Sequence, residues 1–447
     1  MEERDYLKDV CVCLVTVVVV MAALIFFPGW EFGGVKVKRI NIFSDLMADT
    51  MSQNKLQKDT ANIAADLTGT DSGKVVVPDP VIRIEDFSAD TAMRRFYGVL
   101  KNGTWKKRPV RIAFLGDSYI EADIITEDLR MWLQQTYGGR GVGFVPVWSP
   151  AGGYRLTIGQ EAQGWTSYSM VYHQKADWKR LFISGEYFEP SEGATFSVKS
   201  VSSEGKDLFS EARFFFQNRG NTHIRVKVDD RDTVYRPVAS DSLLQHFCLR
   251  GKMRQLDFSF SKVEGFTAFG TFLDERRGVY VDNFALRGSS GIVLSIMDKE
   301  LIQQLLETMI YDLVVLEFGL NVVMPDATRY SSYRKQMGRA VEHLKGCFPE
   351  TAFLLLSVAD RGYRKADGNF GTRDGVVRLV EEQREIARDA GIAFWNMFEA
   401  MGGRDAMVSF VKHDPPLGNK DYTHINHLGG RKIAGELVRA LKAGINE

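Results

Sequence analysis

The sequence predicts an α/β protein: a parallel sheet sandwiched by helices, interrupted by an inserted all-β module and preceded by a transmembrane helix. Strand-like and helix-like segments alternate on either side of residue 118 and again from residue 278, which is typical of a parallel sheet. Between them, residues 149–274 are dominated by short runs of alternating apolar and polar residues, which predict a β-sandwich or jelly roll. Residues 10–27 carry no charge.

Composition sets broad limits on the function. The chain has 447 residues, a length typical of two or three domains. Its 57 basic residues balance 57 acidic residues, so net charge gives no indication of a nucleic-acid partner. No cysteines have zinc-type spacing, and we expect Cys248 and Cys347 to be free thiols, although an oxidising compartment would allow them to pair.

The uncharged segment at 10–27 is at the threshold length for a membrane-spanning helix. Phe26, Phe27 and Pro28 provide no small-residue cleavage site, so we expect an uncleaved anchor, with a buried core helix as the alternative. The basic residues at 36–39 would by themselves place the C-terminal side in the cytoplasm. The expected division is a tail at 1–9, an anchor at 10–28, a polar stalk at 29–80, α/β segments at 81–148 and 275–447, and the β-module at 149–274.

One stretch predicts a functional serine. The apolar run that begins at Arg111 ends in Gly116-Asp117-Ser118, and a helical pattern follows from Ile124. Ser118 therefore lies at the carboxyl edge of the predicted sheet, where open α/β sheets bind ligands. Such a serine is either a helix cap, the commoner case for an isolated motif, or a nucleophile.

Further motifs offer partners for a nucleophile. Asp421 and His424 stand three residues apart in a loop before the last predicted helix, a spacing that lets a base and its orienting carboxylate meet. His427 is a competing base, and together these three side chains could bind a metal, but the chain offers no further tight ligand cluster. Asn321 follows a second buried strand and could donate to an oxyanion or act as a cap.

The order Gly-Asp-Ser, Gly, Gly-x-Asn and Asp-x-x-His resembles the SGNH (GDSL-type) serine hydrolase family over about 108–148 and 275–447. The resemblance implies a flavodoxin-like sheet, no cofactor and no metal. It also implies a catalytic triad of Ser118, His424 and Asp421, and an oxyanion hole formed by Ser118, Gly288 and Asn321. Gly291 lies close enough to compete with Gly288.

Other details of the motifs refine this resemblance. Gly429 matches the family's glycine five residues after the histidine. Tyr422 departs from the pattern, because the family often has glycine there, and we expect it to shape the pocket without abolishing catalysis. The lipase-type G-x-S-x-G motif is absent from the chain.

The anchor, the inserted β-module and the context of residues 117–123 more narrowly resemble bacterial peptidoglycan O-acetylesterases and related cell-envelope acylhydrolases. This implies a membrane-anchored esterase, periplasmic or extracellular, that removes acetyl groups from an acylated glycan. The module would resemble a carbohydrate-binding domain. Four of its aromatic residues are candidates for stacking on sugar rings, and each could instead pack in the core of the module: Trp148, Tyr154, Trp165 and Tyr168. A glycan O-acetyltransferase and an inactive glycan-binding protein are the alternatives.

Overall fold

The computed structural model describes residues 31–32, 35–36, 80–89, 92–171, 176–201, 208–230 and 232–447. The chain divides into two units, 1–79 and 80–447. In the first unit, β1 (Glu31–Phe32) pairs antiparallel with β2 (Val35–Lys36). The expected anchor at 10–28 and most of the expected stalk at 29–80 lie outside the described residues. Within the described part of the chain, no helix is both long and apolar enough to cross a membrane.

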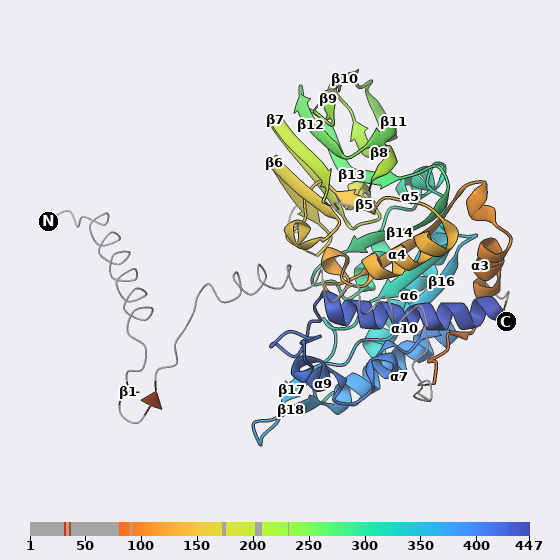
Figure 1. The fold of residues 1–447 in the computed structure, drawn as a ribbon, viewed down its shortest axis with the longest axis vertical. Coiled ribbons are helices and arrows are strands. Elements are labelled where there is room, and N and C mark those ends of the chain that lie inside the picture. The colour runs from red at the N-terminus through yellow and green to blue at the C-terminus, as the bar shows by residue number, and fades with distance from the viewer. Residues whose placement is uncertain are drawn as a thin grey trace, which may run out of the picture. The chain divides into compact units, whose positions relative to one another are not determined.

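The second unit contains a six-stranded sheet, shown in Figure 1. All neighbouring strands are parallel except β3, which pairs antiparallel with β19. In chain order the parallel strands run 2-1-3-4-5, the flavodoxin-like arrangement. The sheet order is β14 (Gly278–Ala285), β4 (Pro109–Gly116), β15 (Leu313–Glu317), β16 (Ala352–Leu356), β19 (Ala393–Trp395) and β3 (Glu85–Asp86).

The central strands are continuous apolar runs because helices cover both faces of the sheet. Every residue of β15 and β16 is buried, as parallel sheets require. In Figure 1, α4 and α10 cross in front of the parallel strands. One group of helices that pack together is α3 (Ala92–Lys101), α4 (Thr126–Tyr137) and α10 (His427–Asn446); the other is α5 (Lys299–Leu306), α6 (Ser331–Cys347) and α7 (Asp374–Asp389).

The inserted module is a single nine-stranded sheet, in which every pairing is antiparallel. The sequence predicted a sandwich or jelly roll, and the sheet achieves a similar packing by folding over itself. Phe214 on β8 lies 5.0 Å from Phe258 on β12 between ring centroids, although β13 and β7 separate these strands in the sheet order. The strands are β5 (Gly143–Pro146), β6 (Ile158–Ser169), β7 (Glu186–Ser200), β8 (Phe209–Asn218), β9 (His223–Val228), β10 (Asp232–Pro237), β11 (Asp241–Met253), β12 (Gln255–Ser261) and β13 (Phe266–Asp274).

The module is joined to the α/β sheet through β13. This strand pairs with β5, β7 and β8, and Gly270 allows the close contact with β5, because a Cβ there would lie 2.4 Å from the Val145 carbonyl oxygen. Phe144, Phe269 and Phe272 belong to the same buried cluster as the α/β core. The module therefore packs directly on the domain that carries Ser118. Cys248 and Cys347 are free, as expected.

Candidate active site

Ser118 lies immediately beyond β4, where β4 and β15 meet and the strand order reverses. This is the switch point at which doubly wound sheets bind ligands. Gly116 is required there, because a Cβ would lie 2.9 Å from both the Glu317 carbonyl oxygen and the Ile120 side chain. The cap interpretation of Ser118 is wrong, since α4 begins only at Thr126 and the Ser118 hydroxyl contacts a histidine.

Ser118, His424 and Asp421 form a hydrogen-bonded chain. Ser118 Oγ lies 3.1 Å from His424 Nε2, and His424 Nδ1 lies 2.7 Å from Asp421 Oδ2. The backbone N–H groups of Thr423 and His424 both donate to Asp421 Oδ1, which fixes this carboxylate. Partial burial would raise the pKa of Asp421, but these hydrogen bonds hold it below its ordinary value. The arrangement can transfer a proton from the serine to the histidine.

The competing histidine points elsewhere. His427, at the start of α10, places Nε2 3.1 Å from the carbonyl oxygen of Tyr154. Asn426 caps the same helix by accepting from the Gly429 N–H, so Asp421 and His424 remain in the preceding loop as the spacing predicted. The expectation that the chain uses no metal or other cofactor stays a prediction.

The structure brings Asn321 beside the serine motif. The Asn321 side-chain amide donates to Asp117 Oδ2 at 3.1 Å and to the Ser289 carbonyl oxygen at 2.9 Å. An amide nitrogen has two protons, so both are engaged here, and donation to a bound oxyanion requires Asn321 to share or exchange one of these bonds. Hydrogen bonds made by catalytic groups are often poorly aligned in the free protein and reach their final geometry only when a ligand binds.

The two candidate glycines differ in what their N–H groups contact. The Gly291 N–H donates to Ser289 Oγ at 3.1 Å and is therefore engaged. No described residue accepts a hydrogen bond from the N–H of Gly288 or of Ser118. Gly288 is exposed with φ of 79°, a left-handed conformation that favours glycine. Between the two glycines, the free N–H favours Gly288 as a donor.

Two buried carboxyl groups beneath this site were not foreseen. Asp117 accepts hydrogen bonds from the Tyr119 N–H and from Asn321, yet burial raises its pKa to about 6. Glu317 ends β15, and neither of its carboxylate oxygens has a partner among the described residues. Burial and then the neighbouring Asp117 raise the pKa of Glu317 well above its ordinary value. For Glu317 the sequence gave no signal of function, because a buried strand was the only pattern visible there, and for Asp117 the motif did not indicate that its carboxyl group would be buried.

Replacing Glu317 with glutamine is expected to change the pH dependence of stability. The unfolded chain releases the Glu317 proton above its ordinary pKa of 4.5, whereas the folded chain retains it. The free energy of unfolding therefore falls as pH rises above 4.5, until the raised pKa is passed. Glu317→Gln removes this contribution, which is about 1.4 kcal/mol per pH unit within the window.

Urea unfolding of the wild type and of Glu317→Gln at several pH values between 4.5 and 8 measures this difference. Glu264→Gln, at an exposed glutamate of the module, is the matched control and should keep the wild-type slope. An unchanged slope in Glu317→Gln would show that this carboxyl titrates normally in the folded protein.

Tyr422 holds the loop that carries His424, and the expectation that it shapes the pocket at Ser118 without abolishing catalysis stays a prediction. Its φ of 55° lies in the left-handed region, which accounts physically for a glycine preference at this position. Its ring stacks on Phe370 at 3.9 Å between centroids, against the hairpin of β17 (Gly362–Arg364) and β18 (Phe370–Thr372). Tyr422 therefore anchors the loop that carries His424 to this hairpin, and it does not line the cavity described next.

A cavity of about 360 Å³ lies between the β-module and the loop after Ser118. Of the aromatic residues singled out in the sequence, Trp148 lines this cavity and its residue surface is 44% exposed. Trp165 and Tyr168 instead pack on Phe260 and Tyr187 within the module. Tyr154 is exposed and does not line the cavity.

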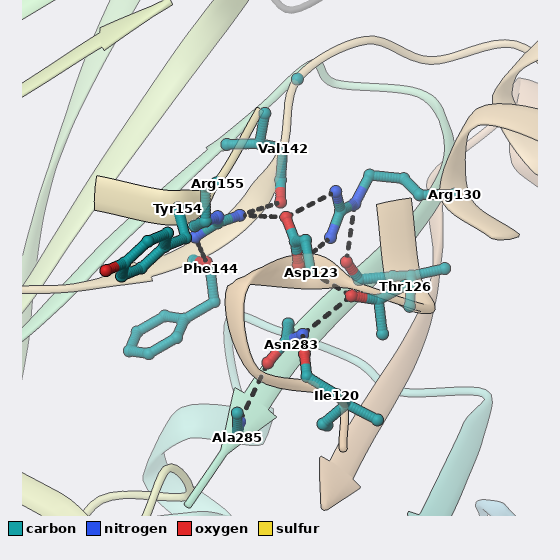
Figure 2. A network of polar contacts seen from close by, with 12 residues as sticks. Ile120, Asp123, Thr126, Arg130, Val142, Phe144, Tyr154, Arg155, Asn283 and Ala285 are labelled. Carbon is teal, nitrogen blue, oxygen red and sulfur yellow. Dashed lines mark hydrogen bonds and ion pairs between the residues drawn. The ribbon is translucent and has the colours of Figure 1, made fainter. Parts of the chain in front are cut away.

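Asp123 holds the loop that follows the serine, as Figure 2 shows. Ala122 and Asp123 both have left-handed φ values, 56° and 64°. The Asp123 carboxylate pairs with Arg130 of α4 at 3.1 Å and with Arg155, just before β6, at 2.6 Å. Burial alone would raise the pKa of Asp123, but the two guanidinium groups hold it well below its ordinary value. This network ties the loop to both α4 and the inserted module.

Comparison with one solved structure supports the fold. A peptidoglycan O-acetylesterase matches with a TM-score of 0.66 at 18% identity, covering 81% of this chain and 99% of that one. A family two carbohydrate esterase from Cellvibrio japonicus matches with a TM-score of 0.27 at 12% identity, over 65% of this chain and 99% of that one. No protein-family model matches the sequence, and neither does any curated protein. The described chain thus shares the fold of a peptidoglycan O-acetylesterase, in agreement with the resemblance seen in its motifs.

Proposed function

We propose that the protein is a serine esterase that removes O-acetyl or other short acyl groups from a cell-envelope or extracellular glycan. The observation that supports this most is the hydrogen-bonded chain from Ser118 through His424 to Asp421 at the switch point of the sheet. The similarity of fold to a peptidoglycan O-acetylesterase makes O-acetylated peptidoglycan the first substrate to test.

In the acylation step, His424 Nε2 accepts the Ser118 proton as Oγ attacks the ester carbonyl carbon. The N–H groups of Ser118, Gly288 and Asn321 stabilise the oxyanion, and Asp421 stabilises the imidazolium that forms. The sugar hydroxyl then leaves with the proton from His424, and an acetyl-serine remains. No group outside the chain is required for this step.

In the deacylation step, His424 removes a proton from water as the water oxygen attacks the acetyl carbon. The bond between that carbon and Ser118 Oγ then breaks, His424 returns the proton to Oγ, and acetic acid leaves and ionises in water. A glycan O-acetyltransferase would use a sugar hydroxyl in place of this water. The His424 and Asp421 side chains are 37% and 48% exposed, so water reaches the base in the free protein, which favours hydrolysis. Acetate release from O-acetylated peptidoglycan, measured with and without an added sugar acceptor, separates the two reactions.

A catalytically inactive glycan-binding protein is the remaining alternative. It predicts no acetate release from any acetylated ester, together with unchanged glycan binding in Ser118→Ala. The esterase proposal predicts acetate release by the wild type and its loss in the same variant. Peptidoglycan stripped of its O-acetyl groups by mild base is the substrate control.

We place the enzyme at the cell envelope, anchored by residues 10–28, because these residues carry no charge and their length is at the threshold for a spanning helix. The catalytic domain would then be periplasmic or extracellular, where the glycan is. Fractionation of cells that express residues 1–447 or 29–447 tests this assignment. The longer chain should sediment with membranes and resist alkaline carbonate, whereas the shorter chain should not.

Replacing Asn321 with alanine is expected to lower kcat by about 10²–10³-fold, which corresponds to about 2.7–4 kcal/mol of transition-state stabilisation. The reason is the loss of a side-chain donor to the oxyanion beside Ser118. Steady-state kinetics on an acetyl ester measure it, with KM expected to change little. A rise in KM with kcat unchanged would assign Asn321 to substrate binding and remove it from the oxyanion hole.

A further inference from the structure

Polar residues line the cavity beside Trp148, and three of them carry a buried atom that has no partner among the described residues. Gln160 Oε1, Ser184 Oγ and Arg155 Nε are buried, and none has a hydrogen-bond partner among the described residues. Buried polar groups in folded proteins are rarely unpaired, and each one costs free energy until a ligand or water completes it. Their cavity, at about 360 Å³, has the size of a small-ligand site.

These atoms are held in place by the bonds that their residues do make. The Gln160 amide nitrogen donates to the Pro146 carbonyl oxygen at 2.6 Å, which fixes Oε1. The other guanidinium nitrogens of Arg155 donate to Asp123 and to the Phe144 carbonyl oxygen, as Figure 2 shows, so that Nε is left over. These three atoms lie behind the accessible surface, so they make the wall of the cavity polar and rigid, and direct contact with a ligand falls to other lining residues.

The charges around the cavity favour an uncharged ligand. Arg155 is paired with Asp123, and Arg287 is paired with Glu121, so both guanidinium groups on the wall are already neutralised. Glu186 also lines the cavity, and burial and then Glu121 raise the pKa of Glu186 to about 8. At neutral pH this carboxyl is therefore mostly protonated, and it can both donate and accept a hydrogen bond.

The remaining wall is apolar. Phe144, Phe284 and Leu286 line it, and Trp148 lies among them with much of its surface exposed. An indole face in the same cavity as a protonated carboxyl group can pack against the C–H face of a pyranose ring while a ring hydroxyl reaches that carboxyl.

Two connections join residues that line the cavity to residues of the active site. The Glu121 N–H donates to the Ser118 carbonyl oxygen at 3.4 Å, and Arg287, which pairs with Glu121, immediately precedes Gly288. A sugar in the cavity would therefore lie next to the part of a polymer that reaches Ser118.

We propose that this cavity is a subsite for one uncharged, hydroxyl-bearing sugar ring of the polymer, adjacent to the ring whose ester Ser118 attacks. The proposal rests on the proposed glycan substrate. It assigns Trp148 and Glu186 to substrate binding, with no part in the chemical step.

The test measures binding separately from turnover. Calorimetric titration with a tetramer of N-acetylglucosamine, which is uncharged, is performed on the wild-type protein and on Trp148→Ala, Glu186→Ala and Glu186→Gln. Trp148→Ala and Glu186→Ala are expected to weaken binding by about tenfold each, the effect of one lost stacking or hydrogen-bonding contact. Glu186→Gln should bind nearly as well as the wild type, because it keeps both a donor and an acceptor.

Controls address specificity and folding. Tyr235→Ala removes an exposed aromatic residue on β10, outside the cavity, and should leave binding unchanged. Far-UV circular dichroism of each cavity variant, expected to match the wild-type spectrum, shows that the variants fold whether or not the protein hydrolyses esters. Equal binding by all variants, or tighter binding of an acidic uronic-acid tetramer, would overturn the proposal. If the wild type binds the tetramer through Trp148 yet hydrolyses no ester, the subsite stands and the esterase proposal fails.

Discussion

Replacing Ser118 with alanine is expected to lower kcat for acetyl-ester hydrolysis by on the order of 10⁶-fold, the loss measured when the nucleophile of a serine triad is removed. The physical reason is that no acyl-enzyme can form without Oγ, and His424 then has no hydroxyl to deprotonate. Ser118 is half-buried, and the hydrogen bond of its hydroxyl is to the His424 side chain. The variant should therefore keep the wild-type stability.

Acetate release and urea unfolding of the same preparations check both parts of this expectation. Ser332→Ala, at an exposed serine in the first turn of α6, is the matched control and should retain full activity. Activity of Ser118→Ala within about tenfold of the wild type would show that another group attacks the ester, which a triad mechanism does not allow.

Replacing Asp123 with alanine is expected to destabilise the protein by about 3–5 kcal/mol, the usual cost of removing one partner from a buried ion pair. The variant leaves the guanidinium groups of Arg130 and Arg155, whose side chains are 3% and 7% exposed, without their carboxylate. The loop after Ser118 also loses the contact that holds its left-handed residues (Figure 2).

Urea unfolding at pH 7 measures the stability of Asp123→Ala, and steady-state kinetics measure the effect of a loosened loop on hydrolysis. The control is Glu381→Ala, which removes the exposed partner of Arg378 on the surface of α7 and should leave the free energy of unfolding nearly unchanged. If both variants lose the same small amount, the buried network contributes no more than a surface pair.

The sequence was sufficient to predict the α/β layers and the meeting of Ser118, Asn321, Asp421 and His424. The strands that precede Ser118 and Asn321 are continuous apolar runs, so their ends had to lie at one edge of a parallel sheet. The Asp-x-x-His spacing indicated that one loop can supply a base and its orienting carboxylate, and the resemblance to the SGNH family implied that this loop meets Ser118.

The supporting residues could not be predicted in the same way. The pairing of Asp123 with Arg155 spans the boundary between the α/β domain and the module, so it depends on how the two pack. Glu186 lies on a strand of the module, where a single acidic residue resembles an ordinary solvent-facing position until the packing on both faces is known. Glu317 ends a strand that the sequence predicted as buried, but the pattern did not show that its carboxyl group would lack a partner. The residues that line the cavity also depend on this packing. They come from β6, β7 and the loop after Ser118, which are separate in the sequence and come together only in the folded chain.

The central claim is that Ser118 carries the acyl group, and trapping that intermediate tests it most directly. The protein is mixed with 4-nitrophenyl acetate, quenched in acid within the first turnovers and digested for mass spectrometry. We predict a 42 Da acetyl adduct, the mass of an acetyl group replacing a proton, on the peptide that contains Ser118, and its absence in Ser118→Ala. Continued ester hydrolysis with no adduct on Ser118, or with the adduct on another residue, would contradict the account.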